Sequence, residues 1–236
     1  MANDSFAIEV RGLHAAYGES RALHGVDINV RASEVVALLG RNGAGRTTTL
    51  RSIMGMLDRV DGSVRVAGKE VIGLPSHKIA RLGIGYCPEE RGIFASLNCM
   101  ENLLLPPVIR AGGLSLRSTF EFFPNLEQRA KTPGSRLSGG EQQMLALARI
   151  LRTGSRILLL DEISEGLAPV IVKRLAEIVL KLKDMGYTIL LVEQNFRFAA
   201  PLADRFYLLE SGKVVDSFAR DDLPSRTAQL HAALGV

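Results

Sequence analysis

The chain has 236 residues, of which 47% are hydrophobic and 23% are charged, enough for a large core beneath a charged surface. This length is long for one compact domain and short for two independent domains. The formal net charge of +4, from 29 basic and 25 acidic residues, is too small to indicate a nucleic-acid partner and suits the anionic cytoplasmic face of a membrane equally well.

Neither a secretion signal nor a membrane-spanning segment is expected. Residues 1–6 lack a basic stretch followed by an apolar core. The longest apolar runs, such as 157–160 and 189–192, are far too short to cross a bilayer. Cys87 and Cys99 have neither CxxC spacing nor histidine neighbours, so no cysteine metal site is predicted. If the protein serves a membrane, it acts from outside the lipid.

The first third of the chain predicts a small antiparallel sheet. Residues 6–13 and 22–30 alternate apolar and polar side chains, as half-buried strands do, and residues 18–20 supply the turn between them. Residues 62–66 and 69–72 predict a further hairpin around a glycine.

A strand, a glycine-rich loop and a helix follow one another between these hairpins. The apolar run 35–39 predicts a buried strand, and apolar residues recur at helical spacing over 49–57. The loop has the P-loop spacing G-x-x-x-x-G-K-[ST], except that Arg46 stands where lysine belongs. The expected phosphate-binding residues are Gly40, Asn42, Gly43, Ala44, Gly45, Arg46, Thr47 and Thr48.

The chemistry of a P-loop explains these residue types. Glycines let successive N–H groups approach an anion, and the helix directs its positive N-terminus at the same point. Thr47 would offer its hydroxyl to Mg²⁺, and the expected ligand is a nucleoside triphosphate; the alternative is a glycine-rich turn without a ligand. Arg46 keeps a permanent charge, but its planar fork is larger than an ammonium group. The loop therefore predicts nucleotide binding and leaves the rate of turnover open.

The remaining elements predict a parallel, doubly wound α/β core with an inserted helical segment. The expected helices and strands, in chain order, are a helix at 76–82, a strand at 84–87, helices at 100–105, 116–123 and 140–152, a strand at 156–160, a helix at 169–185, and strands at 187–193 and 204–210. Prolines and glycines interrupt the short helices between residues 88 and 134.

Two further motifs carry chemistry. In the sequence LSGGEQQ, Ser138 is a natural helix N-cap, and Gly139 and Gly140 expose the first backbone N–H groups, which makes a second anion site. Alone, this could be an ordinary capped helix. Asp161 and Glu162 end an apolar strand, where a parallel sheet presents functional groups. The alternative is a solvated acidic pair.

With these motifs in this order, the chain resembles the ATPase subunit of an ATP-binding cassette (ABC) transporter, from the N-terminus to about residue 218. The resemblance implies a P-loop NTPase with a parallel RecA-like core sheet, a small antiparallel β subdomain and an inserted helical subdomain. In one ABC ATPase domain, the nucleotide-binding core would comprise 1–87 and 150–218, the helical signature subdomain 88–149, and a C-terminal helix 219–236.

The resemblance also implies ATP and Mg²⁺ as ligands. Asp161 would hold the hydrated Mg²⁺, and Glu162 would polarise the attacking water as the general base. Since cassettes of this family pair head to tail, Ser138, Gly139 and Gly140 would contact the nucleotide on the opposite subunit's P-loop. Tyr17 lies where the family stacks an aromatic ring on adenine, although ordinary packing is the alternative.

Besides Arg46, three positions depart from the general family pattern. Glu89 stands where most cassettes have a glutamine that senses Mg²⁺ and the permease; it is a candidate catalytic and metal ligand, or a surface carboxylate. Gln194 replaces the switch histidine and can donate a hydrogen bond to γ-phosphate but carries no proton or charge. Ile163 replaces a proline, which alters backbone stiffness.

The sequences PEERGIFASL, MENL and LLVEQN resemble the branch that energises branched-chain amino-acid uptake, in particular its shorter ATPase subunit. Relatives that serve urea or short-chain amides share much of this pattern, and Arg46 is not part of it. The expected function is that of an importer ATPase subunit. The alternatives are a catalytically weakened, nucleotide-holding cassette paired with an active sister subunit, and a soluble cassette ATPase acting on nucleic acid or ribosomes.

The implied partners are a second ATPase subunit, identical or different, transmembrane permease subunits and, indirectly, a periplasmic solute-binding protein, with no nucleic acid. The permease would dock on 89–134, where Phe94 and Leu97 are either contacts or packing residues of the subdomain. The protein would lie peripherally on the cytoplasmic face of the cell (inner) membrane. The amphipathic segment 225–234 is expected to dock on the protein's own core.

Overall fold

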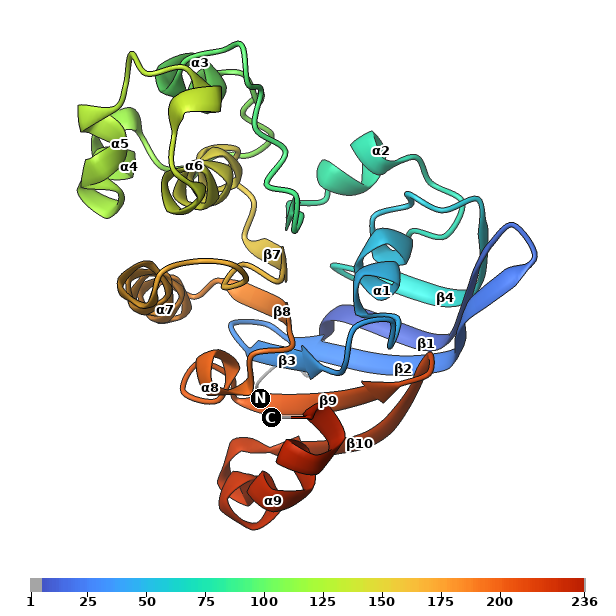
Figure 1. The fold of residues 1–236 in the computed structure, drawn as a ribbon. Coiled ribbons are helices and arrows are strands. Elements are labelled where there is room, and N and C mark those ends of the chain that lie inside the picture. Colours follow the sequence, from blue (N-terminus) through green and yellow to red (C-terminus); the bar gives the residue numbers. More distant parts are fainter. Residues whose placement is uncertain (1–5, 236) are drawn as a thin grey trace, which may run out of the picture.

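A six-stranded sheet forms the centre of the molecule in the computed structural model, which describes residues 6–235 (Figure 1). The strand order is β10-β9-β3-β8-β7-β6. The strands are β3 (Val35–Leu39), β6 (Ile84–Cys87), β7 (Ile157–Asp161), β8 (Thr188–Glu193), β9 (Arg205–Glu210) and β10 (Lys213–Ala219). Neighbours from β9 to β6 are parallel, and β10 joins the β9 edge in antiparallel orientation. The predicted parallel core is confirmed.

The second sheet is antiparallel and has the order β2-β1-β4-β5. Its strands are β1 (Phe6–Tyr17), β2 (Ser20–Arg31), β4 (Arg59–Val66) and β5 (Lys69–Glu70). The pairing of β1 with β2 continues to Tyr17 and Ser20, beyond the predicted strand ends. Register shifts along this pair break the alternation of side chains, and for this reason the sequence pattern ended too early.

The helices surround the two sheets, and α3 to α6 gather into a group at one side (Figure 1). The helices are α1 (Arg46–Ile53), α2 (Ser76–Ala80), α3 (Cys99–Leu104), α4 (Leu116–Phe122), α5 (Pro124–Gln128), α6 (Gly139–Arg152), α7 (Pro169–Asp184), α8 (Phe196–Ala199) and α9 (Leu223–Leu234). The sequence did not predict α5, α8 or β10. The two helices have 5 and 4 residues, too few for a helical period to emerge.

Strand β3 shows why the central strands read as continuous apolar runs. All five of its residues are fully buried. Val35, Ala37 and Leu39 face the cluster that includes residues of α6 and α7, whereas Val36 and Leu38 face the cluster that includes residues of α1 and the antiparallel sheet. Successive side chains of a strand point to opposite faces, so a sheet covered on both faces needs no polar position.

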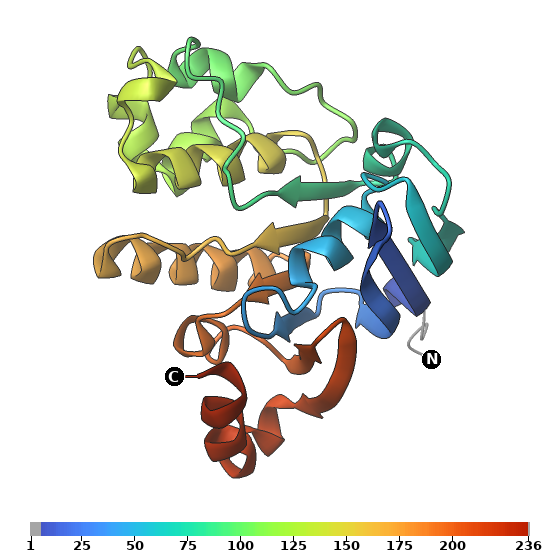
Figure 2. The same cartoon turned by 45° about the vertical axis from the view of Figure 1, so that its right-hand side comes forward.

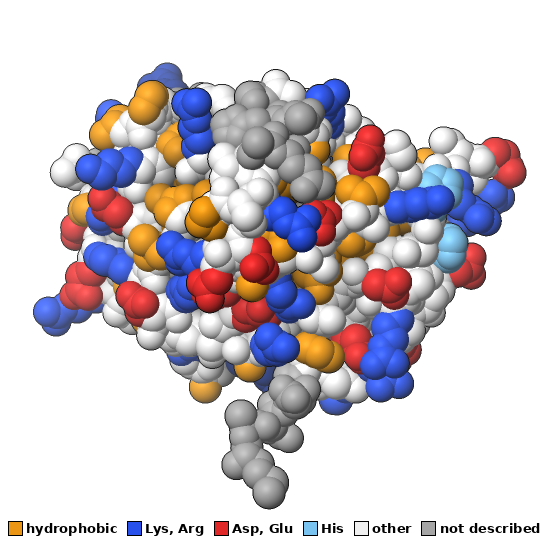
Figure 3. Space-filling model, turned by 90° about the horizontal axis from the view of Figure 1, so that it is seen from below, with side chains coloured by type: hydrophobic (Ala, Val, Ile, Leu, Met, Phe, Trp, Pro, Cys, Tyr) orange, Lys and Arg blue, Asp and Glu red, His pale blue; other side chains and the backbone are white. Residues whose placement is uncertain are grey.

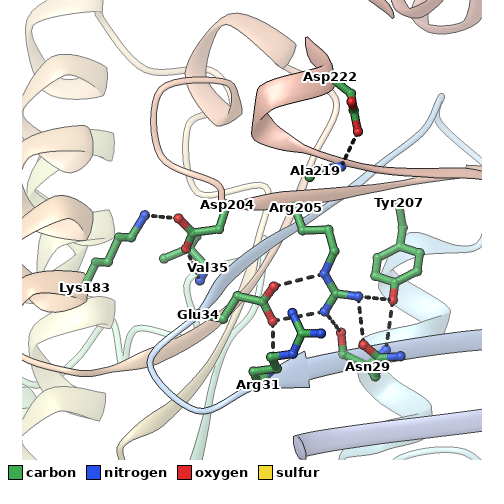
Figure 4. A network of polar contacts seen from close by, with 10 residues as sticks. All are labelled: Asn29, Arg31, Glu34, Val35, Lys183, Asp204, Arg205, Tyr207, Ala219 and Asp222. Carbon is green, nitrogen blue, oxygen red and sulfur yellow. Dashed lines mark hydrogen bonds and ion pairs between the residues drawn. The ribbon is translucent and has the colours of Figure 1, made fainter. Parts of the chain in front are cut away.

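A polar network joins the two sheets (Figure 4). The guanidinium of Arg205 on β9 donates to both carboxylate oxygens of Glu34, at 2.9 and 3.0 Å. It also donates to Asn29 Oδ1 on β2 and to the Tyr207 hydroxyl, each at 2.8 Å. The arginine and glutamate side chains are only 19% and 11% exposed. This planar fork therefore fixes the antiparallel sheet against the central sheet that carries the P-loop.

The C-terminal helix docks on the protein's own core, as predicted. Leu230 and Leu234 of α9 are buried, and Arg41 Nε donates to the Ala233 carbonyl at 2.8 Å. On the face shown in Figure 3, basic and acidic side chains intermingle. Across residues 6–235, none of the helices combines the length and apolarity that a membrane span requires.

Candidate nucleotide site

The polar residues singled out in the sequence follow strands that end at one edge of the central sheet. Strands β3, β6, β7 and β8 are mutually parallel and point the same way in Figure 2. The P-loop follows β3, Glu89 follows β6, Glu162 follows β7, and Gln194 follows β8. Ligands of open parallel sheets bind at the carboxyl ends of the strands, so this edge is the candidate site.

The P-loop encloses a small cavity at the start of α1. Gly45 is the N-cap of the helix and has φ 104°, and a Cβ built on it would lie 2.7 Å from Leu23 Cδ2, so only glycine fits. The first N–H groups of a helix lack intrahelical partners and attract anions. The cavity has a volume of about 280 Å³ and is lined by Ala22, Asn42, Gly43, Ala44, Gly45, Arg46, Thr47, Thr48, Glu89, Glu162 and Glu165.

Arg46 is buried in this site and is paired with the predicted general base. Its side chain is 4% exposed, and its guanidinium donates to the Gly40 carbonyl, to Asn42 Oδ1 at 3.1 Å and to the Glu162 carboxylate. Burial raises the pKa of Glu162, and the positive charge of Arg46 opposes that rise. The arginine thus joins the phosphate-binding loop to the carboxylate across the cavity.

Asp161 carries a hydroxyl donor on each of its carboxylate oxygens. Thr47 Oγ1 donates to Oδ1 at 3.1 Å, and the Tyr86 hydroxyl donates to Oδ2 at 2.9 Å. Burial raises the pKa of Asp161, while hydrogen bonds from Tyr86 and Thr47 lower it and the charge of Glu89 raises it further. Hydroxyl and carboxylate oxygens suit Mg²⁺, so Thr47, Asp161 and Glu89 form a donor set that fits this ion.

Gln194 and Glu162 line a neighbouring cleft of about 950 Å³, together with Asn42. This cleft also reaches Gly166 and Leu167, in the loop before α7. Gln194 therefore lies next to the P-loop cavity, because Asn42 and Glu162 line both spaces. Gln194 is not one of the described residues that line the P-loop cavity itself.

Tyr17 lies at the end of β1, and its side chain is 45% exposed. It lines a separate cleft of about 770 Å³ with Arg51 and Tyr86. An exposed ring in this position is available for stacking, and the adenine role of Tyr17 stays a prediction.

The signature residues lie at the start of α6, away from the P-loop cavity. Ser138 is the N-cap, as predicted: the Glu141 N–H donates to its hydroxyl at 3.3 Å, and its own N–H donates to the Glu141 carboxylate at 2.8 Å. A Cβ on Gly140 would lie 2.9 Å from Ile171, so this glycine also permits close packing against α7. None of Ser138, Gly139 and Gly140 lines the cavity around Arg46 among the described residues. Their action on a nucleotide of another subunit stays a prediction.

The sequence pattern indicates no site role for Tyr86 or Glu193, which it predicts only as strand residues. In the structure Tyr86 contacts Asp161 and Glu193 contacts Ser164, and both partners are far away in sequence. One feature of the sequence could have indicated Tyr86 and Glu193: each is a polar side chain in an otherwise apolar strand that ends at the edge of the sheet where the site lies.

A central parallel sheet that leads into a P-loop, with an aspartate and a glutamate at the end of a neighbouring strand, defines a P-loop nucleoside triphosphatase. Residues 23–165 match the family model described as ABC transporter. The chain therefore belongs to the ABC transporter family. Within this family it is an ATP-binding subunit, an ATPase.

Three relatives illustrate the range of this family. The chain is 42% identical to the high-affinity branched-chain amino acid transport ATP-binding protein BraG of Pseudomonas aeruginosa, over 84% of this chain and 87% of the relative. It is 36% identical to the probable branched-chain amino acid transport ATP-binding protein LivF of Archaeoglobus fulgidus, over 89% of this chain and 91% of the relative. It is 33% identical to the lipopolysaccharide export ATP-binding protein LptB of Escherichia coli K12, over 88% of each chain.

Solved structures share the fold. A nucleotide-free ATP-binding cassette superimposes with a TM-score of 0.84 at 21% identity, covering 98% of this chain and 99% of the other. A dimeric bacterial ABC transporter cassette superimposes with a TM-score of 0.79 at 25% identity, covering 90% of this chain and 98% of the other.

Proposed function

We propose that this chain is the ATPase subunit of an importer for branched-chain amino acids. In this proposal, ATP binding closes two cassettes on each other, hydrolysis opens them, and an attached permease alternates its access. The substrate is supported by the similarity to BraG and LivF, whose names refer to branched-chain amino acid transport. The protein would lie peripherally on the cytoplasmic face of the membrane, held by the permease, with a periplasmic solute-binding protein delivering the amino acid.

The convergence of Thr47, Asp161 and Glu162 on the P-loop carries the catalytic part of the proposal. Bound Mg²⁺ supplies positive charge to the phosphate oxygens. Thr47, Asp161 and Glu89 would hold the Mg²⁺, and Glu162 would accept a proton from the attacking water. Arg46 moves from Glu162 to the phosphates as nucleotide enters, because a phosphate anion competes for the same fork of donors. Gln194 donates a hydrogen bond to the γ-phosphate.

The signature residues lie outside the P-loop cavity of their own chain, which supports a site shared between two cassettes. A dimeric cassette of similar fold supports the same arrangement. In a head-to-tail pair, Ser138, Gly139 and Gly140 would complete the partner's site with the N-terminus of α6.

Replacing Ser138 with arginine is therefore expected to abolish dimerisation in Mg²⁺ and a non-hydrolysable ATP analogue, while the monomer binds nucleotide within about twofold of the native affinity. Sedimentation velocity measures the dimer, and fluorescent-nucleotide titration measures the affinity. Ser115→Arg is the matched control, because Ser115 also caps a helix through its hydroxyl and is exposed. Each lost cap costs about 1 kcal/mol. An equal loss of dimer in both variants, or of monomer affinity in Ser138→Arg, contradicts the shared site.

The substrate is tested with the chain and its permease in proteoliposomes. Leucine, isoleucine and valine carried by the solute-binding protein are expected to stimulate ATP hydrolysis and to accumulate inside, whereas urea and acetamide do neither. Stimulation by urea or acetamide alone would assign the chain to amide import. Since the LptB relatives support lipid export as a second candidate, stimulation by lipopolysaccharide without amino-acid uptake would favour that function.

The pairing of Arg46 with Glu162 favours one further alternative, a cassette that holds ATP while a sister subunit hydrolyses it. The two functions differ in the turnover of the native chain, which a comparison with Arg46→Lys measures.

A further inference from the structure

A buried carboxylate beside the site has no role in the proposed mechanism. Glu193 ends β8, is 1% exposed and forms no ion pair within the described part of the chain. Burying a carboxylate without a cationic partner is costly, and burial raises the pKa of Glu193 to about 8. Hydrogen bonds from Ser164 offset part of this cost.

The two oxygens of Glu193 are both used by one residue of the segment that follows β7. Oε1 accepts the Ser164 N–H at 3.1 Å, and Oε2 accepts the Ser164 hydroxyl at 2.9 Å. Ser164 is itself buried, at 5% exposure. The preceding residue of β8 also holds the segment after β7, through a backbone hydrogen bond. The Val192 carbonyl accepts the Glu162 N–H at 2.9 Å. Two consecutive residues of β8 thus hold the chain at positions 162 and 164.

Glu162, the first of these two positions, has a strained backbone. Glu162 has φ 47°, in the left-handed region that a residue with a Cβ rarely adopts and that persists only where its surroundings hold it. This conformation accompanies the contact of its carboxylate with Arg46 in the P-loop cavity. The following residue is Ile163 and not proline, so no ring fixes the backbone after Glu162. Hydrogen bonds from β8 supply the constraint.

We propose that Glu193 is a positioning residue, which acts through Ser164 to hold Glu162 in its left-handed conformation with the carboxylate directed at the P-loop. The inference rests on the proposed role of Glu162 as general base. Glu193 does not touch the nucleotide in this scheme, so its loss changes the chemical step and leaves nucleotide binding intact.

Two variants separate the hydrogen bonds of Glu193 from its ability to carry a charge. Glu193→Ala removes both hydrogen bonds to Ser164, whereas Glu193→Gln removes only the ionisable group. Glutamine keeps both contacts, since its amide oxygen accepts the Ser164 N–H and its NH₂ group donates to the hydroxyl. Thr188→Val is the matched control: Thr188 lies at the other end of β8, is buried, and accepts the Ser33 N–H at 2.9 Å. Thr188→Val removes a partly buried hydrogen bond from the same strand without altering residues 162–164.

Steady-state hydrolysis of Mg-ATP and amide hydrogen exchange of residues 162–164 are measured for each variant. Each variant is made twice, once with the native Arg46 and once combined with Arg46→Lys. In Glu193→Ala, we expect faster exchange at Ser164 and a kcat lower by about tenfold or more, with KM within about twofold. Glu193→Gln is expected to restore kcat to within about threefold, and Thr188→Val to keep it.

An unchanged kcat in Glu193→Ala, or an equal fall in Thr188→Val, would overturn the inference and leave Glu193 a structural residue. A Glu193→Gln chain as slow as Glu193→Ala would also overturn it, because the charge and not the hydrogen bonds would then matter. Glu162→Gln, measured in parallel, separates this inference from the proposed function. If Glu162→Gln stays active, the base assignment fails; if it is inactive while Glu193→Ala is active, only the positioning role fails.

Discussion

Replacing Glu162 with glutamine is expected to lower kcat for Mg-ATP hydrolysis by about 10²- to 10⁴-fold, the usual contribution of a general base. Glutamine has nearly the same shape but cannot accept a proton from water. Nucleotide affinity is expected to stay within a few-fold, because the P-loop is unchanged. The variant is also expected to accumulate as an ATP-bound dimer. Phosphate release measures turnover, and light scattering with ATP measures the dimer.

Glu177→Gln is the matched control for this prediction. Glu177 lies on α7, is paired with Arg174 and lines neither the P-loop cavity nor the neighbouring cleft. It is expected to keep kcat within about threefold. Unchanged turnover in Glu162→Gln, or an equal loss in Glu177→Gln, would remove Glu162 as the base.

Replacing Arg46 with lysine is expected to raise kcat/KM for Mg-ATP by about tenfold or more, because each charge-assisted hydrogen bond to Glu162 and the loop that must break as nucleotide enters contributes on the order of 1.5–3 kcal/mol. The Arg46 guanidinium donates to Gly40, Asn42 and Glu162 at the same time. A lysine ammonium is a compact point charge without this planar fork of donors, so it is not expected to keep all three contacts. Lysine therefore frees the carboxylate of Glu162 at a lower cost. Turnover is measured by phosphate release and ATP affinity by calorimetry.

Arg46→Ala completes this series and is expected to weaken ATP binding by about tenfold or more, since it removes the cation of the loop. Native turnover within a few-fold of the lysine variant would contradict the prediction and identify arginine as a tolerated phosphate clamp. If both forms bind ATP and only the lysine form hydrolyses it, the native chain is a nucleotide-holding cassette, and its partner subunit supplies the hydrolysis.

Local pattern determined much of the candidate site. The glycine spacing of the P-loop, the N-cap at Ser138 and the acidic pair after an apolar strand each depend on residues within one turn or one strand end. The parallel core was also predictable, since fully buried strands such as β3 carry no polar position. The edge strand β10 was not predicted, because its half-exposed residues have no strong apolar run.

Only the tertiary structure decided which side chains meet. Arg46 and Glu162 are 116 residues apart, and Tyr86 and Asp161 are 75 apart. The 29-residue separation of Ser164 and Glu193 is likewise bridged by neighbouring strands. Such contacts depend on the order and register of the strands, which side-chain periodicity within one segment does not specify. The sequence by itself determined a nucleotide-binding loop and an acidic strand end. The order β3-β8-β7 in the central sheet decided that the arginine of the loop pairs with the glutamate after β7.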